Sequence, residues 1–294
     1  MKNLIVVTGG SGFVGSNLIE YFLKETKLKI ISLDNYSSGS KKNHILNKRV
    51  KYLKSDTKHI SQTLKIYKNR INAIFHFGEF SRIYQSFLNM NECINSNTIG
   101  TNSVFNFCLK NKIKLIYSAT SASLGNKGLD KNLSPYAFTK SKNLELLENL
   151  KKWYNFKYEV IYFYNVYGPK QISKGKMSTV IGIFEQAFKN KKPLPVVRPG
   201  NQSRRFTHID DTIEICYLAW KKNKCRHYSI SNKVSYSILD VAKMFKRKIK
   251  FLKKRPGERY ASALTNMNLS NKVYKYFGKK RLKDYIDQII DDNN

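Results

Sequence analysis

The sequence is poor in acidic residues. Of its 294 residues, 20 are Asp or Glu and 54 are Lys or Arg, so the formal net charge at pH 7 is +34. Such a charge attracts nucleic acids, anionic membrane surfaces and phosphorylated metabolites. No basic run is interleaved with aromatic residues, and no recognition-helix or finger motif is present. We therefore interpret the lysines as solvated surface residues and predict no specific nucleic acid partner, although the charge would favour capture of a nucleotide diphosphate.

Long hydrophobic runs are also missing. A helix that spans a bilayer needs ~20 consecutive apolar residues, and no run in this sequence approaches that length. The start, MKNLIVVTGG, has a short apolar stretch followed by glycines. This pattern is typical of a buried strand and not of a signal peptide, so we expect a cytoplasmic protein with no membrane partner.

Cysteine and histidine are too few and too scattered to suggest a disulfide framework or a metal centre. The four cysteines contain no Cys-x-x-Cys pair, and the five histidines contain no i,i+4 pair. Both spacings are the usual signals for thiolate or imidazole ligation. We predict free thiols and no metal site for these residues: Cys93, Cys108, Cys216, Cys225, His44, His59, His76, His208 and His227.

Apolar runs bounded by polar turns alternate with helical patterns, which predicts βαβ units and a parallel sheet. The expected strands are Leu4–Thr8, Lys29–Asp34, Val50–Lys54, Ala73–Phe77, Lys114–Ser118 and Glu159–Tyr164. After YNVYGPK the pattern changes to helices, short strands and long basic loops, with expected helices at Thr179–Lys189, Asp211–Lys221 and Ser237–Phe245. The predicted fold class is α/β: a doubly wound (Rossmann) sheet over residues 1–170 and a smaller C-terminal α/β lobe over residues 171–294.

A glycine-rich turn follows the first expected strand. In TGGSGFVGSNL, Gly9, Gly12 and Gly15 have the spacing G-x-x-G-x-x-G. Glycine permits a tight turn, close approach to a pyrophosphate and close packing of the next helix, whose N-terminus offers unpaired N–H groups. Asp34 ends the second expected strand, nineteen residues beyond Gly15. A carboxylate there accepts from ribose hydroxyls and repels a 2′-phosphate, so the sequence predicts NAD as the cofactor in preference to NADP.

The segment SPYAFTK contains a tyrosine and a lysine at positions i and i+4, Tyr136 and Lys140. On a helix this spacing places both side chains on one face. A phenol has an unperturbed pKa near ~10 and becomes a base at neutral pH only beside positive charge, which Lys140 and an oxidised nicotinamide would supply. Taken alone, the pair could be an accident in a chain with 19 tyrosines and many lysines.

A hydroxyl at the end of a strand would complete such a site by holding the substrate oxygen from which Tyr136 takes a proton. The segment IYSATSASLG offers several, and we choose Thr120 from the candidates Ser118, Thr120, Ser121 and Ser123. In this order and context, we interpret Thr120, Tyr136 and Lys140 as catalytic residues.

Together these motifs resemble the extended short-chain dehydrogenases/reductases, and within them the NAD-dependent nucleotide-sugar epimerases and dehydratases of the UDP-glucose 4-epimerase type. The resemblance covers nearly the whole chain and includes SDT, NTIGT, YNVYGP, RRFTHIDD and RPGE. It implies that Asp56 contacts the adenine, and that Asn97 contacts the cofactor phosphates or nearby backbone. The full set of implied cofactor contacts is Gly9, Gly12, Phe13, Val14, Gly15, Asp34, Asn35, Asp56, Thr57, Phe77, Gly78, Asn97, Tyr136 and Lys140.

The resemblance also implies a nucleotide-sugar substrate, held by Asn165, Arg204, Arg255 and Ser262. Arginines suit a diphosphate because they grip it with two parallel hydrogen bonds. The small side chain at Ser262 implies that the pocket admits N-acetylated sugars as well. Three departures from the family pattern are Leu124 in place of tyrosine, Arg205 in place of aspartate, and Gly78 with Glu79 where two small residues usually line the nicotinamide.

Within the resemblance, the residues after Thr120 favour one reaction. Dehydratases have an Asp-Glu pair there and decarboxylases a Glu two positions on, whereas this chain has Ser121 and Ala122. We therefore predict NAD-dependent C4 epimerisation of a UDP-hexose through a 4-keto intermediate. A reductase or a C2 or C6 epimerase remains an alternative. A cofactor-sensing or nucleic-acid-binding protein on the same fold is a further one, which the intact catalytic residues disfavour.

The resemblance implies a homodimer as well. In the family, two helices pack against the same pair from a second subunit, and they correspond here to Asn97–Leu109 and Tyr136–Trp153. Apolar residues on these stretches face either the core or a partner, and the sequence does not separate the two. They are Phe105, Leu109, Leu144 and Leu147.

Overall fold

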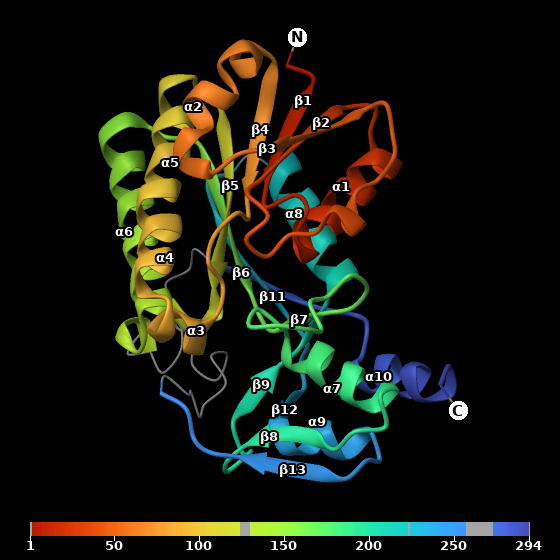
Figure 1. Ribbon diagram of the computed structural model, residues 1–294. Helices are drawn as coiled ribbons and strands as arrows, with labels where there is room; N and C mark the ends of the chain where they lie inside the picture. Colours follow the sequence, from red (N-terminus) through yellow and green to blue (C-terminus); the bar gives the residue numbers. More distant parts are fainter. Residues whose placement is uncertain (1, 124–129, 223, 257–272, 294) are drawn as a thin grey trace.

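The computed structural model describes residues 2–123, 130–222, 224–256 and 273–293. Its centre is an eight-stranded sheet of order β14-β11-β6-β5-β4-β1-β2-β3, in which every neighbouring pair is parallel (Figure 1). The strands are β1 (Leu4–Thr8), β2 (Lys29–Asp34), β3 (Val50–Lys54), β4 (Ile71–His76), β5 (Lys114–Thr120), β6 (Tyr158–Phe163), β11 (His227–Ser231) and β14 (Val273–Phe277). The first three have the bounds expected from the sequence, and the doubly wound α/β fold class is confirmed.

Helices cover both faces of this sheet. On one face, α1 (Phe13–Glu25) and α8 (Ile209–Lys222) lie side by side (Figure 1). The apolar stripe of α1, at Leu18, Ile19 and Phe22, is fully buried there, as the 3.6-residue period requires. The opposite face carries α2 (Ile60–Thr63), α5 (Thr101–Lys110) and α6 (Pro135–Tyr154).

Two strands beyond residue 170 return to the large sheet. β11 pairs with β6, and β14 pairs with β11. The sequence-based division at residue 170 does not include this return of the chain, because both strands are short and β14 has only partly buried or exposed residues. The part of the chain after residue 170 therefore contributes to both the sheet and the second lobe.

In the described part of the chain, three two-stranded sheets lie beyond the large one. β7 (Val166–Tyr167) pairs with β10 (Thr207–His208), β8 (Leu194–Val197) with β13 (Ile249–Leu252), and β9 (Ser203–Arg205) with β12 (Ser235–Ser237). They pack with α7 (Val180–Lys189), α9 (Ile238–Met244) and α10 (Leu282–Asp291) around a separate core that includes Phe184, Phe206 and Phe245 (Figure 1). The prolines around β8 are accommodated because it is a strand of a two-stranded sheet.

The segment that carries Tyr136 and Lys140 begins with local signals that the sequence contains. Helix α6 starts after Ser134, whose side chain accepts a hydrogen bond from the backbone N–H of Ala137, and Pro135 occupies the first turn. Both features stabilise a helix N-terminus. Two short helices that contact α6, α3 (Ile83–Leu88) and α4 (Met90–Ile94), lead into a π-helical turn at Asn95–Gly100. This turn continues into α5.

Among the described residues, the other helical segments are 3₁₀ turns at Lys41–Asn43, Thr57–His59, Lys65–Arg70 and Ser121–Ser123. In the part of the chain that the structure describes, no helix combines the length and apolar character needed to cross a membrane.

Candidate active site

The glycine turn between β1 and α1 forms a cradle for an anion. Gly9 has a positive φ of 68°, and a Cβ there would lie 2.9 Å from the backbone of Gly78. A Cβ on Gly15 would lie 2.2 Å from the carbonyl oxygen of Gly9, so α1 approaches the turn only without a side chain. Gly12 precedes the helix and supplies no side-chain cap. The first N–H groups of α1 are thus left for a ligand such as a pyrophosphate, and the cradle fits the dinucleotide predicted from the sequence.

Asp34 lies at the carboxyl end of β2, beside this cradle. Its carboxylate accepts hydrogen bonds from the backbone N–H groups of Ser11 (2.9 Å) and Tyr36 (2.8 Å). Burial raises the pKa of Asp34, and the two backbone hydrogen bonds oppose that rise. These contacts hold the carboxylate at the end of β2, beside the cradle, which is where the sequence predicts an acceptor for ribose hydroxyls.

One cavity of about 520 Å³ joins the cradle to Thr120, Tyr136 and Lys140, the residues that the sequence predicts to be catalytic. It lies at the carboxyl ends of β1, β2, β4, β5 and β6, the usual ligand position in a doubly wound sheet. Most of the residues predicted from the sequence line it: Gly9, Gly12, Phe13, Val14, Gly15, Asp34, Asn35, Thr57, Phe77, Gly78, Thr120, Tyr136, Lys140, Asn165, Arg204 and Arg255. Ser262 and Leu124 lie outside the described residues.

Two predicted cofactor residues do not line this cavity. Asp56 caps a 3₁₀ turn and accepts a hydrogen bond from the side chain of Asn35 (3.0 Å). Asn97 is fully buried, and its carboxamide bonds the backbone N–H and carbonyl of Phe80 (2.7 and 3.0 Å). Because both ends of this carboxamide bond the protein, a direct contact of Asn97 with the cofactor phosphates is not supported. The contacts of Asn97 correspond to the second possibility given above, a contact with nearby backbone.

Tyr136 and Thr120 meet in the cavity from α6 and the end of β5. Both are buried, and Thr120 accepts a hydrogen bond from the backbone N–H of Ala122 (3.2 Å). Burial raises the pKa of Tyr136 to about 12, whereas a hydrogen bond with Thr120 lowers it. The phenol is therefore protonated at neutral pH in the free protein, and positive charge bound beside it would favour its ionisation.

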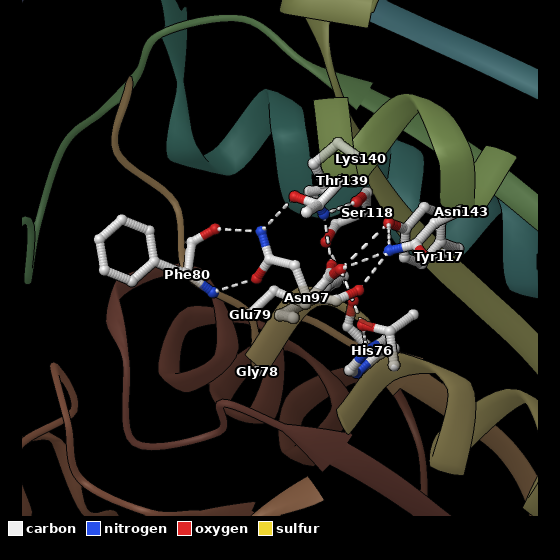
Figure 2. A network of polar contacts seen from close by, with 12 residues as sticks. His76, Gly78, Glu79, Phe80, Asn97, Tyr117, Ser118, Thr139, Lys140 and Asn143 are labelled. Atoms are coloured by element: carbon white, nitrogen blue, oxygen red, sulfur yellow. Dashed lines mark hydrogen bonds and ion pairs between the residues drawn. The ribbon is translucent and has the colours of Figure 1, made fainter. Parts of the chain in front are cut away.

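Lys140 is one turn further along α6 and is also buried. Its ammonium group contacts Glu79 and the backbone oxygen of Ser118, and it faces the ring of Tyr117 at 4.6 Å (Figure 2). Burial lowers the pKa of Lys140, and Glu79 opposes that change. The sequence flagged Glu79 as a departure from the family pattern, but the pairing with Lys140 was not predicted.

The far end of the cavity carries arginines. Arg204, on β9, and Arg255 both line it, and the Arg255 guanidinium lies 5.0 Å from the ring centre of Tyr84. The side chain of Asn165 donates to the backbone oxygen of Arg205 (2.9 Å). Arg82 also lines the cavity and was missed by sequence reasoning, because an isolated arginine in so basic a chain gives no signal. It donates twice to the backbone oxygen of Met177 (3.0 and 2.7 Å).

Sequence comparisons relate this chain to known nucleotide-sugar epimerases. A family model described as the NAD dependent epimerase/dehydratase family matches residues 5–231. A putative UDP-glucose 4-epimerase from Methanocaldococcus jannaschii is 26% identical over 230 residues, which cover 74% of each chain. An ADP-L-glycero-D-manno-heptose-6-epimerase from Brachyspira hyodysenteriae is 27% identical over 259 residues, covering 83% of this chain and 80% of the relative.

Solved structures agree with the fold. The UDP-glucose 4-epimerase of Thermotoga maritima, solved with UDP-glucose, superposes with a TM-score of 0.87 at 22% identity. The match covers 98% of this chain and 97% of that structure. The likeness therefore extends over both lobes and includes the strands that return to the sheet.

Proposed function

Because the chain belongs to the NAD dependent epimerase/dehydratase family, we propose that it epimerises a nucleotide sugar at C4, with a UDP-hexose as the substrate. Its cofactor is NAD, and its relatives are sugar-nucleotide enzymes. The observation that carries the proposal is the meeting of Thr120, Tyr136 and Lys140 in the same cavity as the glycine cradle.

Each catalytic side chain has a role that its position supports. Tyr136 takes the proton from the sugar hydroxyl and later returns it, and Thr120 orients that hydroxyl through its own. Lys140 supplies positive charge one turn along α6 from the phenol, and its ion pair with Glu79 offsets part of that charge. NAD bound along the glycine cradle and Asp34 would supply the hydride acceptor and donor for the sugar carbon. The arginines at the far end, Arg204 and Arg255, hold the diphosphate.

The carboxylates of the cavity favour epimerisation over elimination or decarboxylation. Among the described residues that line it, the acidic ones are Asp34 and Glu79. Asp34 is bonded to backbone N–H groups, and Glu79 is paired with Lys140. Neither is placed to protonate a leaving hydroxyl, and the positions after Thr120 hold Ser121 and Ala122. A simple oxidation and reduction at one carbon needs no further acid.

A panel of nucleotide sugars tests the proposal. We expect the purified protein with NAD to interconvert UDP-glucose and UDP-galactose, followed by ¹H NMR of the anomeric proton. The panel includes the N-acetylated UDP sugars, UDP-glucuronic acid, and GDP-, CDP- and ADP-linked sugars. Turnover of an ADP-heptose alone, or release of water or CO₂ from any sugar, would contradict C4 epimerisation of a UDP-hexose.

We also propose a homodimer formed through α6 and the π-helical turn. Phe105 and Leu147, which the sequence left between core and partner, are buried in the core. Other apolar side chains of these elements are exposed instead: Ile99 (51%), Phe138 (45%) and Trp153 (63%). Exposed apolar groups that gather on packed elements mark interaction surfaces.

Light scattering at micromolar concentration measures the assembly. We expect a dimer for the unaltered chain and a shift toward monomer for Phe138→Glu, because the charge would be buried unpaired at the interface. Asp287→Asn changes a residue on α10, in the second lobe, whose side chain is 42% exposed, and serves as the control. A monomer for the unaltered chain would rule out the dimer.

A further inference from the structure

Glu79 has an unusually complete set of donors around its carboxylate. One oxygen, Oε2, pairs with the ammonium group of Lys140. The other, Oε1, accepts hydrogen bonds from the hydroxyl of Thr101 (2.9 Å), the hydroxyl of Tyr117 (3.1 Å) and the carboxamide of Asn143 (3.3 Å) (Figure 2). The side chains of Glu79 and Lys140 are 2% and 4% exposed. Each of these contacts donates a hydrogen bond, so both carboxylate oxygens act as acceptors, as in the ionised side chain.

His76 extends the network and fixes its direction. The Thr101 hydroxyl gives its one hydrogen to Glu79, so it accepts from Nε2 of His76 (3.0 Å). Nδ1 of His76 then accepts from the hydroxyl of Thr8 (2.7 Å). Burial lowers the pKa of His76 to about 4, so the ring is neutral. A neutral ring leaves Lys140 as the cation that balances Glu79.

The ammonium group of Lys140 is thus committed largely to the protein. Of its three N–H groups, one faces Glu79 and another the backbone oxygen of Ser118. With Glu79 charged, the pair is neutral overall, and the electrostatic support that Lys140 gives to Tyr136 is reduced. Small residues at this position, the family pattern, would leave the lysine charge uncompensated.

Resting on the function proposed above, we propose that Glu79 is a positioning residue for the reaction: it holds Lys140 in place and offsets its charge, so that ionisation of Tyr136 depends on positive charge bound in the cavity. The base then becomes active when the oxidised cofactor is present. This assigns a role to Glu79, which occupies one of the two positions where the family usually has small residues.

The other charged and titratable groups around the pair do not replace Glu79. Tyr136 is faced by Glu79, Arg82 and Cys93, and Lys140 by Glu79 and Cys93. The Arg82 cation lowers the pKa of Tyr136, but burial and Glu79 still hold that pKa at about 12. Burial raises the pKa of Cys93 to about 11, so this thiol is neutral. The remaining neighbours of the pair, His76 and Tyr117, are neutral at pH 7, since burial raises the pKa of Tyr117 well above its usual value.

The sign of the expected change follows from these charges. Glu79 raises the pKa of Tyr136 and also raises that of Lys140. In Glu79→Gln both pKa values should therefore fall. Ionisation of Tyr136 sets the acidic limb of the pH–rate profile and deprotonation of Lys140 sets the alkaline limb, so both limbs should move to lower pH. A nearby charge moves a pKa by ~1 unit or more.

Two readouts test the proposal. The first is the NMR titration of the Lys140 ¹³Cε signal with NAD present, assigned by its loss in Lys140→Arg. We expect a midpoint lower by ~1 pH unit or more in Glu79→Gln than in the unaltered protein. The second is the pH profile of UDP-galactose turnover, in which both limbs should move in the same direction. Glu145→Gln removes an exposed carboxylate from the same helix as Lys140 and should change neither.

The outcomes separate this proposal from the proposed function. An unchanged Lys140 midpoint in Glu79→Gln would overturn the role of Glu79, whatever the substrate. A protein that turns over no nucleotide sugar would refute the proposed function and leave the titration decisive. If Glu79→Gln does not fold, Glu79→Asp withdraws the carboxylate from Lys140 and should lower the midpoint in the same direction. An unchanged midpoint there would equally overturn the proposal.

Discussion

Replacing Tyr136 with phenylalanine is expected to lower kcat by ~10²- to 10⁴-fold, the usual cost of losing a general base. The ring stays in its buried position between α6 and the cavity, and only the ionisable oxygen is removed. Binding of NAD and of the nucleotide sugar should therefore change little. In the unaltered protein, the raised pKa of Tyr136 predicts that turnover increases with pH across the neutral range.

The measurement compares kcat and KM of Tyr136→Phe with those of Tyr154→Phe. Tyr154 lies on the same helix, but 61% of its side chain is exposed, so the same chemical change should have no effect there. Retained NAD, read from absorbance, and the melting temperature confirm that the fold is intact. Activity of Tyr136→Phe within a few-fold of the unaltered enzyme would end the proposed mechanism.

Asp34→Asn is expected to weaken NAD binding by ~10- to 100-fold, because a hydrogen bond to a charged group contributes ~1.5–3 kcal/mol. The amide removes the charge that repels a 2′-phosphate and keeps one oxygen, which can accept from one of the two backbone N–H groups, because Ser11 bonds Oδ2 and Tyr36 bonds Oδ1. Discrimination against NADP should relax at the same time. Asparagine is preferable to alanine here, since alanine would leave both N–H groups without their acceptor.

Titration of both dinucleotides measures this effect. Asp56→Asn is the matched control, because Asp56 lies next to Asn35 but does not line the cavity. It should change the two affinities by the same factor, whereas Asp34→Asn should change their ratio. Equal affinity of the unaltered protein for NAD and NADP would contradict the role assigned to Asp34.

The sequence by itself determined the features that depend on neighbouring residues. These features are the glycine spacing, the position of Asp34 and the i,i+4 placement of Tyr136 and Lys140. The structure has the glycine turn between β1 and α1, Asp34 at the end of β2, and Tyr136 and Lys140 one turn apart on α6. The first three strands likewise have their predicted bounds, because a continuous apolar run between turn residues is a local signal of a buried parallel strand. Local geometry of the backbone is sufficient to set all of these.

The tertiary structure alone decided which distant residues meet. Glu79 and Lys140 are 61 residues apart in sequence, and they meet because β4 and β5 are neighbours in the sheet and α6 packs beside them. The same packing directs the Asn97 carboxamide to Phe80, away from a cofactor, and returns β11 and β14 to the large sheet. Such contacts depend on strand order and on how helices pack, and the residue pattern around each partner is the same whether or not the contact forms.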